Sequence, residues 1–289
     1  MADTVAPQLV SGLRELVDRY DLFLLDQYGV LHDGEAPYPG VVEALEALRR
    51  HGKRICVLTN SGRSSDYNVL RLAQLGLDEA LFDRVATSGD MALDWLLLNR
   101  PGARCFPFAP AAVAPALEAA GLPLAESPDE ADIILLNSLP LPPEEMTEAA
   151  MEPVFEASLR RGLLLVCANP DLVGPRGDRL VISPGTVAGW YRARGGEVLM
   201  FGKPEPDFFH YALSLCPESR VERSVMIGDT PATDLAGAGA VGIDGAFVTG
   251  GIYAAAFAGA APEKHLEIAE RLLREAKAQA AWLLPRLVW

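Results

Sequence analysis

The chain has 289 residues, half of them hydrophobic, and carries a formal net charge of −14. This length fits two domains, or one large α/β domain with an insertion, and the negative charge disfavours nucleic acid and anionic membranes as partners. The four cysteines form no CxxC pair and no Cys/His metal-binding spacing, and the N-terminus lacks the pattern of a signal peptide. We therefore expect a soluble, cytoplasmic protein that binds neither nucleic acid nor a membrane.

Short apolar runs alternate with amphipathic stretches along the chain. The first run, at 22–26, precedes a helical pattern from Val41 to Arg50, and the run at 54–60 precedes another from Tyr67 to Leu77. Further apolar runs follow at 163–171, 197–204, 224–230 and 245–251. Continuous apolar strands separated by helices are typical of a parallel sheet buried on both faces. The pattern predicts an α/β fold with a Rossmann-like parallel sheet, and WLLPRLVW at the end of the chain is a candidate edge strand.

The stretch from Pro101 to about Gly196 differs in texture from the rest. It is rich in proline, as in PLPLPPEE and APAAVAPAL, and it has strand candidates of its own, ARCFPF, ADIILLN and LLLVCAN. We interpret it as a second α/β unit inserted into the first. The prediction is a core domain formed by residues 1–100 and 197–289, and an inserted cap domain formed by residues 101–196. The Pro- and Ala-rich cap is compatible with a homodimer interface.

Four predicted strands end in polar residues that form a consistent set. In an open parallel sheet, ligands bind beyond the carboxyl ends of the strands. Each strand end alone is a weak signal, but the four together predict one site at that edge of the sheet. The four ends are Asp26-Gln27-Tyr28-Gly29, Thr59-Asn60-Ser61, Gly202-Lys203-Pro204 and Gly228-Asp229-Thr230, with Asp234 just beyond the last.

Acidic residues in this set suit phosphoryl transfer. A carboxylate can attack phosphorus and form an acyl phosphate, which divides one difficult displacement into two easier ones. The carboxylate and the phosphate are both anionic, so a divalent cation must lie between them. Asp26 and Asp229 can supply the oxygen ligands that Mg²⁺ prefers.

The remaining members of the set suit phosphate binding. The hydroxyl of Thr59 or Ser61 can donate hydrogen bonds to phosphate oxygens, and so can the backbone amides that follow Asp26, from Gln27 onwards. Lys203 can neutralise charge on both the nucleophile and the phosphate. Gly29 lets the backbone turn sharply at the strand end. The expected substrate is therefore a small-molecule phosphate ester.

Four motifs, LFLLDQYGVLHDG, VLTNSG, FGKPEP and MIGDTPATDLAGA, lie in this order along the chain, and CANPD and SPGTVAGW lie between the second and third. With them the chain resembles the haloacid dehalogenase superfamily. Within it, the chain is similar to the subclass with a large α/β cap, which includes nitrophenyl phosphatases, nucleotide-sugar-operon phosphatases and pyridoxal phosphatase. The resemblance covers nearly the whole chain.

The resemblance implies a Mg²⁺-dependent phosphatase that acts on a small phosphorylated metabolite, a sugar phosphate or nucleotide-like monoester, through an aspartyl phosphate. It also implies a role for each residue of the set. These roles are Asp26 as nucleophile, Ser61 or Thr59 with Lys203 as phosphate binders, Asp229 as metal ligand, Asp234 as a metal support through water, and the backbone carbonyl of Tyr28 as a further metal ligand.

One position departs from the family's pattern. The first motif of the family normally reads Asp-x-Asp, and the second Asp acts as general acid and base, whereas this chain has Tyr28 there. A free tyrosine titrates near pH 10, so its hydroxyl is a poor proton shuttle at neutral pH. His32 or Asp33 in the following loop are candidate substitutes. The alternatives are a slow phosphotransferase, or a phosphometabolite-binding protein with weak catalysis.

Two polar residues of the predicted cap complete the candidate site. Asn169 and Asp171 follow a cap strand and are predicted substrate contacts, although an Asn-Pro-Asp turn explains them equally well. Asn60, within the second motif, is also a predicted substrate contact. A Rossmann dehydrogenase is disfavoured, because no GxGxxG follows the first strand.

Overall fold

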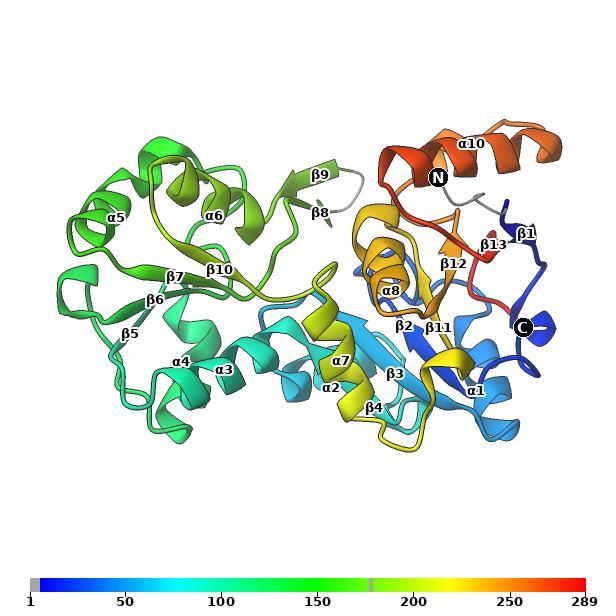
Figure 1. Cartoon of the computed structure of the whole chain (residues 1–289), viewed down its shortest axis with the longest axis horizontal. Coiled ribbons are helices and arrows are strands. Elements are labelled where there is room, and N and C mark those ends of the chain that lie inside the picture. Colours follow the sequence, from blue (N-terminus) through cyan, green and yellow to red (C-terminus); the bar gives the residue numbers. More distant parts are fainter. Residues whose placement is uncertain (1–5, 177–178) are drawn as a thin grey trace. The chain divides into compact units, whose positions relative to one another are not determined.

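The computed structural model describes residues 6–176 and 179–289, which form two compact units (Figure 1). The first unit contains the described residues up to Thr59, together with Val69–Ala86 and Lys203–Trp289. The second unit contains Asn60–Asn68 and Thr87–Gly202. The sequence placed residues 60–68, 87–100 and 197–202 in the core domain, whereas this division groups them with the second unit.

The first unit is built around a sheet of seven strands in the order β1-β13-β12-β11-β2-β3-β4. The five pairings from β1 to β3 are parallel, so the predicted α/β fold class with a Rossmann-like parallel sheet is confirmed. The terminal apolar run does form a strand, but it does not lie at the edge, because β1 pairs along its outer side. The strands are β1 Gln8–Leu9, β2 Leu22–Leu25, β3 Arg54–Thr59, β4 Arg84–Thr87, β11 Ser224–Gly228, β12 Asp244–Val248 and β13 Trp282–Leu284.

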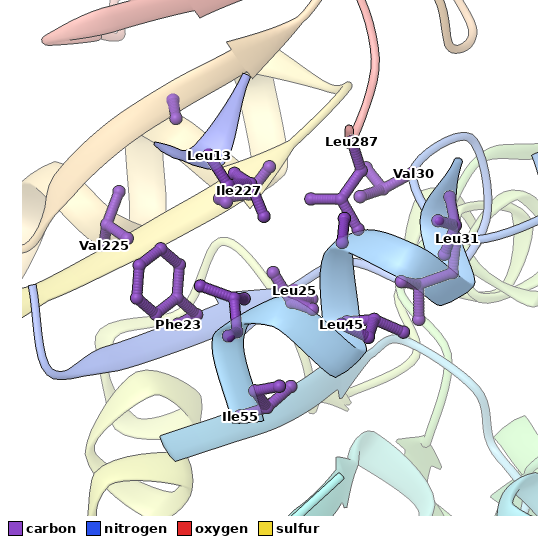
Figure 2. Packing of buried hydrophobic residues seen from close by; sticks show 14 of the residues in the cluster. Leu13, Phe23, Leu25, Val30, Leu31, Leu45, Ile55, Val225, Ile227 and Leu287 are labelled. Atoms are coloured by element: carbon purple, nitrogen blue, oxygen red, sulfur yellow. The ribbon is translucent and has the colours of Figure 1, made fainter. Parts of the chain in front are cut away.

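Both faces of this sheet are covered, which explains why its strands are apolar without alternation. Side chains of one strand alternate between the faces. Ala246 and Val248 of β12 belong to one core cluster, while Phe247 between them belongs to the other. Figure 2 shows part of the first cluster, in which Phe23 and Leu25 of β2 lie with Leu45 of α1.

Helices on the two faces follow the periodic patterns in the sequence. In Figure 1, α10 lies along β12 and β13, and its buried residues share a cluster with Leu283. The predicted helix at Tyr67–Leu77 begins and ends slightly earlier in the structure. The helices that lie wholly or partly in this unit are α1 Val41–Arg50, α2 Ser65–Gln74, α7 Pro206–Ser214, α8 Ala236–Ala240, α9 Ala254–Phe257 and α10 Pro262–Glu275.

The second unit has its own parallel sheet in the order β10-β7-β6-β5 and a separate antiparallel pair, β8 with β9. Helices α5 and α6 cover one face of the sheet, and α3 and α4 cover the other. Because Ala92 and Leu96 of α3 pack in this core, α3 belongs with the second unit. Its elements are α3 Ser88–Asn99, β5 Cys105–Pro107, α4 Pro110–Ala119, β6 Ile133–Leu136, α5 Glu148–Arg160, β7 Leu164–Cys167, β8 Val173–Arg176, β9 Arg179–Ile182, α6 Pro184–Ala193 and β10 Val198–Met200.

Across residues 6–176 and 179–289, none of the helices combines the length and the apolar character that a bilayer crossing requires.

Candidate active site

Three adjacent strands of the first unit bring polar residues to one edge of the sheet. Asp26 follows β2, Thr59 ends β3 and Asp229 follows β11, and these strands are neighbours in the order β11-β2-β3. Asp234 lies in a single π-helical turn, Pro231–Leu235, that begins two residues after Asp229. The sheet order therefore gathers residues that are about 200 positions apart in the sequence.

Three carboxylates form a tight cluster at this edge. Asp26, Asp229 and Asp234 each present a ligand oxygen, and these oxygens lie within 4.8 Å of one another. Asp229 and Asp234 are buried, with exposed fractions of 3% and 0%. Buried like charges at this separation are costly without a cation, and an all-oxygen donor set suits a hard divalent cation. The cluster therefore fits a divalent metal ion.

Lys203 is the cation that the first unit itself supplies to the cluster. Its Nζ donates to Asp26 Oδ1 at 2.6 Å and to Asp234 Oδ1 at 2.7 Å. Burial alone would lower the pKa of Lys203, but the Asp234 and Asp26 carboxylates outweigh it and raise that pKa above its usual range. Lys203 therefore stays protonated, and one positive charge faces three acidic groups.

The excess of negative charge in the cluster contributes to raised pKa values of Asp26 and Asp229. Burial raises the pKa of Asp26 well above its usual value, the Asp234 charge adds to the rise, and Lys203 opposes it. Burial and the Asp234 charge raise the pKa of Asp229 to about 7, against the opposing hydrogen bonds from Ile252 and Thr230. Without a metal ion, the cluster holds protons at pH values where ordinary carboxyl groups have lost them.

Two glycines fit against the Asp229 carboxylate. A Cβ atom built on Gly29 would lie 1.8 Å from Asp229 Oδ2, and one built on Gly251 would lie 2.1 Å from the same oxygen. Gly29 also has a φ of +79°, a conformation that favours glycine. The amide of Ile252 donates to Oδ2 at 2.7 Å, and the hydroxyl of Thr230 donates to Oδ1 at 3.0 Å. Only glycine leaves room for this carboxylate.

Gly251 and Ile252 were not among the site residues predicted from the sequence. The available signal was the Gly250-Gly251 pair directly after a predicted strand, because Gly-Gly marks a turn. A turn alone does not reveal that an amide in it points at a carboxylate from the neighbouring strand.

His32 and Asp33 are engaged in the loop itself. His32 is 1% exposed, its Nδ1 accepts from the Gly34 amide at 2.9 Å, and its Nε2 lies 3.1 Å from the side-chain amide of Gln27. Burial lowers the pKa of His32 to about 4, so the ring is neutral. Asp33 Oδ1 accepts from the amides of Glu35 and Ala36, which lower the pKa of Asp33. These contacts disfavour either residue as a substitute general acid.

Tyr28 is packed onto the same loop and is 40% exposed. Its ring meets the His32 ring edge to face, with centroids 4.6 Å apart. A Cβ atom built on Gly34 would lie 2.0 Å from the Tyr28 hydroxyl, so the hydroxyl covers that glycine. Burial raises the pKa of Tyr28, and its hydroxyl therefore stays protonated at neutral pH.

Comparison with known proteins identifies the family. The family model described as haloacid dehalogenase-like hydrolase matches residues 23–123, and a second model, HAD-hydrolase-like, matches residues 200–275. Chronophin from Homo sapiens is 31% identical over 247 residues, which cover 78% of this chain and 79% of that protein. This chain belongs to the haloacid dehalogenase-like hydrolases. The predicted superfamily and the predicted enzyme type are confirmed.

Other members of the family align over similar lengths. Glycerol-3-phosphate phosphatase from Gallus gallus is 32% identical and covers 77% of each chain. A haloacid dehalogenase-like hydrolase from Brucella suis has a solved structure with a TM-score of 0.82, 30% identity, and coverage of 96% of this chain and 100% of its own. Glycerol phosphate phosphatase from Mycobacterium tuberculosis, solved in complex with calcium, has a TM-score of 0.67 and 27% identity, and covers 82% of this chain and 68% of its own.

Four predicted site residues of this hydrolase lie in the second unit. Asn60 Nδ2 donates to Asp171 Oδ1 at 2.8 Å, and the Asp171 amide donates to Asn169 Oδ1 at 3.0 Å. Ser61 Oγ accepts from Asn68 Nδ2 at 3.1 Å. The bond from the Asp171 amide to Asn169 Oδ1 forms the Asn-Pro-Asp turn that was the alternative explanation for these residues. Asn60 is hydrogen-bonded to this turn through Asp171. The structure thus groups three of the predicted substrate contacts in one hydrogen-bonded chain.

Proposed function

We propose that this hydrolase is a Mg²⁺-dependent phosphatase that acts on a small phosphorylated metabolite through an aspartyl phosphate on Asp26. The observation that carries the proposal is the buried cluster in which Lys203 bridges Asp26 and Asp234, with Asp229 beside them. Two relatives are named as glycerol 3-phosphate phosphatases, which supports the reaction and favours a small phosphate ester as substrate. A sugar phosphate or nucleotide-like monoester is the proposed substrate class.

Asp26 is proposed to do the covalent chemistry. A carboxylate oxygen of Asp26 bonds to phosphorus, the bond from phosphorus to the ester oxygen breaks, and the alcohol departs. Water then attacks the acyl phosphate, which releases inorganic phosphate and restores Asp26. Lys203 orients Asp26 by holding Oδ1 at 2.6 Å and remains positive throughout, which stabilises the negative charge that gathers on the phosphoryl group.

The proposed metal ligands are Asp26, Asp229 and the backbone carbonyl of Tyr28, with Asp234 supporting the site through a water molecule. When bound, Mg²⁺ supplies the positive charge that lets the anionic phosphate approach an anionic nucleophile. Asp26, Asp229 and Asp234 present oxygen atoms, which Mg²⁺ prefers. The raised pKa values of Asp26 and Asp229 show an excess of negative charge that a divalent cation would neutralise.

Phosphate binding is proposed for Lys203, for the hydroxyl of Thr59 or Ser61, and for the backbone amides from Gln27 to Gly29. The side chain of Gln27 is buried beside His32, so its part in binding would come from its backbone. Asn60, Asn169 and Asp171 stay predicted substrate contacts. A homodimer through the second unit also stays a prediction, and analytical ultracentrifugation would test it.

A second function is favoured by one observation, the position of Tyr28. Its hydroxyl covers Gly34, and both His32 and Asp33 are engaged in the loop. Without a general base, water would attack the aspartyl phosphate slowly. The protein would then be a slow phosphotransferase, or a phosphometabolite-binding protein with weak catalysis. Rapid-quench trapping decides between these, because a burst of phosphoenzyme marks slow breakdown and no phosphoenzyme marks simple binding.

The primary test is phosphate release from a panel of phosphorylated metabolites and nitrophenyl phosphate, with and without Mg²⁺. We expect Mg²⁺-dependent release from at least one substrate, and none from that substrate with Asp26→Asn. Phosphate release by a folded Asp26→Asn variant at the wild-type rate would contradict the covalent mechanism. Phosphate release that persists in excess chelator would contradict the proposed requirement for Mg²⁺.

A further inference from the structure

The last residues of the chain, 282–289, lie outside both family-model matches, which end at residues 123 and 275. They comprise β13 and a tail, and we call them the C-terminal segment. β13 pairs with β12 in parallel, so the tail leaves the sheet at its carboxyl edge, where the acidic cluster lies. This placement brings the start of the tail, Pro285 and Arg286, to the loop that follows β12.

The C-terminal segment is bonded to the loop that follows β12. The amide of Thr249 donates to the carbonyl of Leu284 at 3.0 Å, and the amide of Gly250 donates to the carbonyl of Pro285 at 2.9 Å. Two residues further along this loop, the Ile252 amide donates to Asp229 Oδ2 at 2.7 Å. One short loop therefore connects the C-terminal segment to a proposed metal ligand.

Arg286 contacts that loop with its side chain. A Cβ atom built on Gly250 would lie 3.1 Å from Cγ and 3.3 Å from Cζ of Arg286. The Arg286 Cζ also lies 4.6 Å from the centroid of the Tyr38 ring, within the range of a cation–π contact. Burial raises the pKa of Tyr38. The Arg286 charge opposes this rise, and the Asp229 charge adds to it.

The guanidinium group of Arg286 is only partly hydrogen-bonded, through a bond to the side chain of Tyr38. Its Nη1 is buried, and residues 6–176 and 179–289 offer it no acceptor. A buried N–H without a partner costs free energy. Packing against the loop, together with the ring contact and the hydrogen bond to Tyr38, accounts for the position of Arg286.

The tail is anchored on both sides of Arg286. Pro285 is bonded to the loop, and Leu287 is fully buried in the core cluster that Figure 2 shows. The Leu13 amide donates to the Val288 carbonyl at 2.8 Å, and the Trp289 ring lies 4.8 Å from the His51 ring. These contacts hold the tail in place, so that it can support the loop at 249–252.

From these contacts we propose that the C-terminal segment braces the loop at 249–252 and so positions the Asp229 carboxylate for the metal ion, with Arg286 as the positioning residue. The proposal rests on the proposed function, in which Asp229 is a metal ligand. Arg286 acts through Gly250 and Ile252 and touches neither metal nor substrate.

The test measures Mg²⁺ affinity by calorimetry in Arg286→Met, Arg286→Lys and the wild type. Arg286→Met keeps much of the stem and loses the planar cation, whereas Arg286→Lys keeps the charge. The matched control is Arg274→Met on α10, where the arginine is exposed and pairs with Glu270 at 3.8 Å. We expect the Kd for Mg²⁺ to rise about tenfold in Arg286→Met, which equals about 1.4 kcal/mol. The rise should be smaller in Arg286→Lys, and the control should match the wild type.

Hydrogen–deuterium exchange separates positioning from general loosening. In Arg286→Met, the amides at 249–252 should exchange faster, while those of β2 at 22–25 keep the wild-type rate. Unchanged Mg²⁺ affinity in folded Arg286→Met overturns the brace, and so does an equal rise in exchange at both places. If Arg286→Met fails to fold, Arg286→Lys decides by the same criteria. A wild-type protein that binds no divalent cation overturns the proposed function as well, whereas normal wild-type binding confines a failure to the brace.

Discussion

Strand β2 has one carboxylate just before it and one just after it, and the two differ in exposure, in ion pairing and in the direction of their pKa shifts. Asp21, before the strand, has a half-exposed side chain and pairs with Arg223 and with Lys53. The Arg223 contact is the main reason that the pKa of Asp21 is lowered. Asp26, after the strand, is largely buried, shares Lys203 with Asp234, and has a raised pKa.

The same pairing with two cations is found before β4, at the edge of the same sheet. Asp83, on the amino side of the sheet, pairs with Arg49 at 2.7 Å and with Arg54 at 3.1 Å. At that edge Asp21 and Asp83 each pair with two cations, whereas at the carboxyl edge Asp26 and Asp234 share Lys203 and Asp229 lies beside them. An excess of buried negative charge therefore distinguishes the carboxyl edge, where the candidate active site lies. Carboxylates that are balanced by nearby cations contribute only modestly to stability.

The largest expected effect comes from removing the two β2 carboxylates in turn. Asp26→Asn should lower phosphate release by about 10⁴-fold or more, because the covalent nucleophile is lost. Asp21→Asn should leave turnover within about twofold and cost about 1 kcal/mol or less of stability. Steady-state kinetics and denaturant unfolding of both variants check this. Similar losses of turnover in the two variants would break the contrast between the edges.

Adding an acid at the carboxyl edge should change leaving-group selectivity. With Tyr28 in place, an aryl phosphate such as nitrophenyl phosphate should react far faster than an alkyl phosphate, because its leaving oxygen needs little protonation. Tyr28→Asp should raise the alkyl phosphate rate by about tenfold to a thousandfold and so shrink the ratio. The measurement is both rates for both proteins across pH. An equal fall in both rates would mean that Tyr28 is itself required.

Metal binding offers a more moderate test of the charge imbalance. Asp229→Asn keeps the size of the side chain and removes one negative charge, so the Kd for Mg²⁺ should rise by about 10- to 100-fold. Asp83→Asn is the matched control, because it removes a carboxylate from the balanced edge. Calorimetry measures both variants. Equal Mg²⁺ affinity in wild type and Asp229→Asn would argue against Asp229 as a ligand.

The smallest expected effect is on the pH dependence of stability without metal. The pKa of Asp229 is raised to about 7, so its contribution to stability is present below about pH 4 and is lost as the pH rises towards 7. Metal-free Asp229→Asn should therefore gain a few degrees in Tm relative to wild type between pH 4 and 8. Asp21 has a lowered pKa, so its contribution is lost as the pH falls below about 4. Thermal unfolding across pH that showed one trend for both variants would contradict the assignment.

The sequence predicted the acidic cluster well, because each contributing strand is a continuous apolar run that stops at a polar residue. Parallel strands with buried faces leave little choice about which end carries a site. Asp26, Asp229 and Asp234 followed from that rule and from the family resemblance, and the structure brings them together with Lys203. For Lys203 the rule was wrong, because the strand before it, β10, belongs to the sheet of the second unit, and only the family resemblance predicted it. The chemical roles of these four residues stay predictions that the variants above test.

Other features depend on contacts that no local pattern records. The placement of β13 inside the sheet depends on its pairing with residues 8–9 at the opposite end of the chain. Arg286 looked like an ordinary residue between apolar neighbours, and its contact with Gly250 follows only from strand order. Likewise His32 resembles a free loop histidine until the turn at Gly34 is known to donate to its ring.

The order of the strands has a consequence for how the protein is made on the ribosome. Asp26 and Asp229 are 203 residues apart in the sequence, and at about 5–20 residues per second their synthesis is separated by about 10–40 s. The second unit from Thr87 to Gly202 is complete before β11 emerges. The nascent chain therefore carries Asp26 without Asp229 for most of its synthesis, and the seven-stranded sheet is completed only when β13 leaves the exit tunnel.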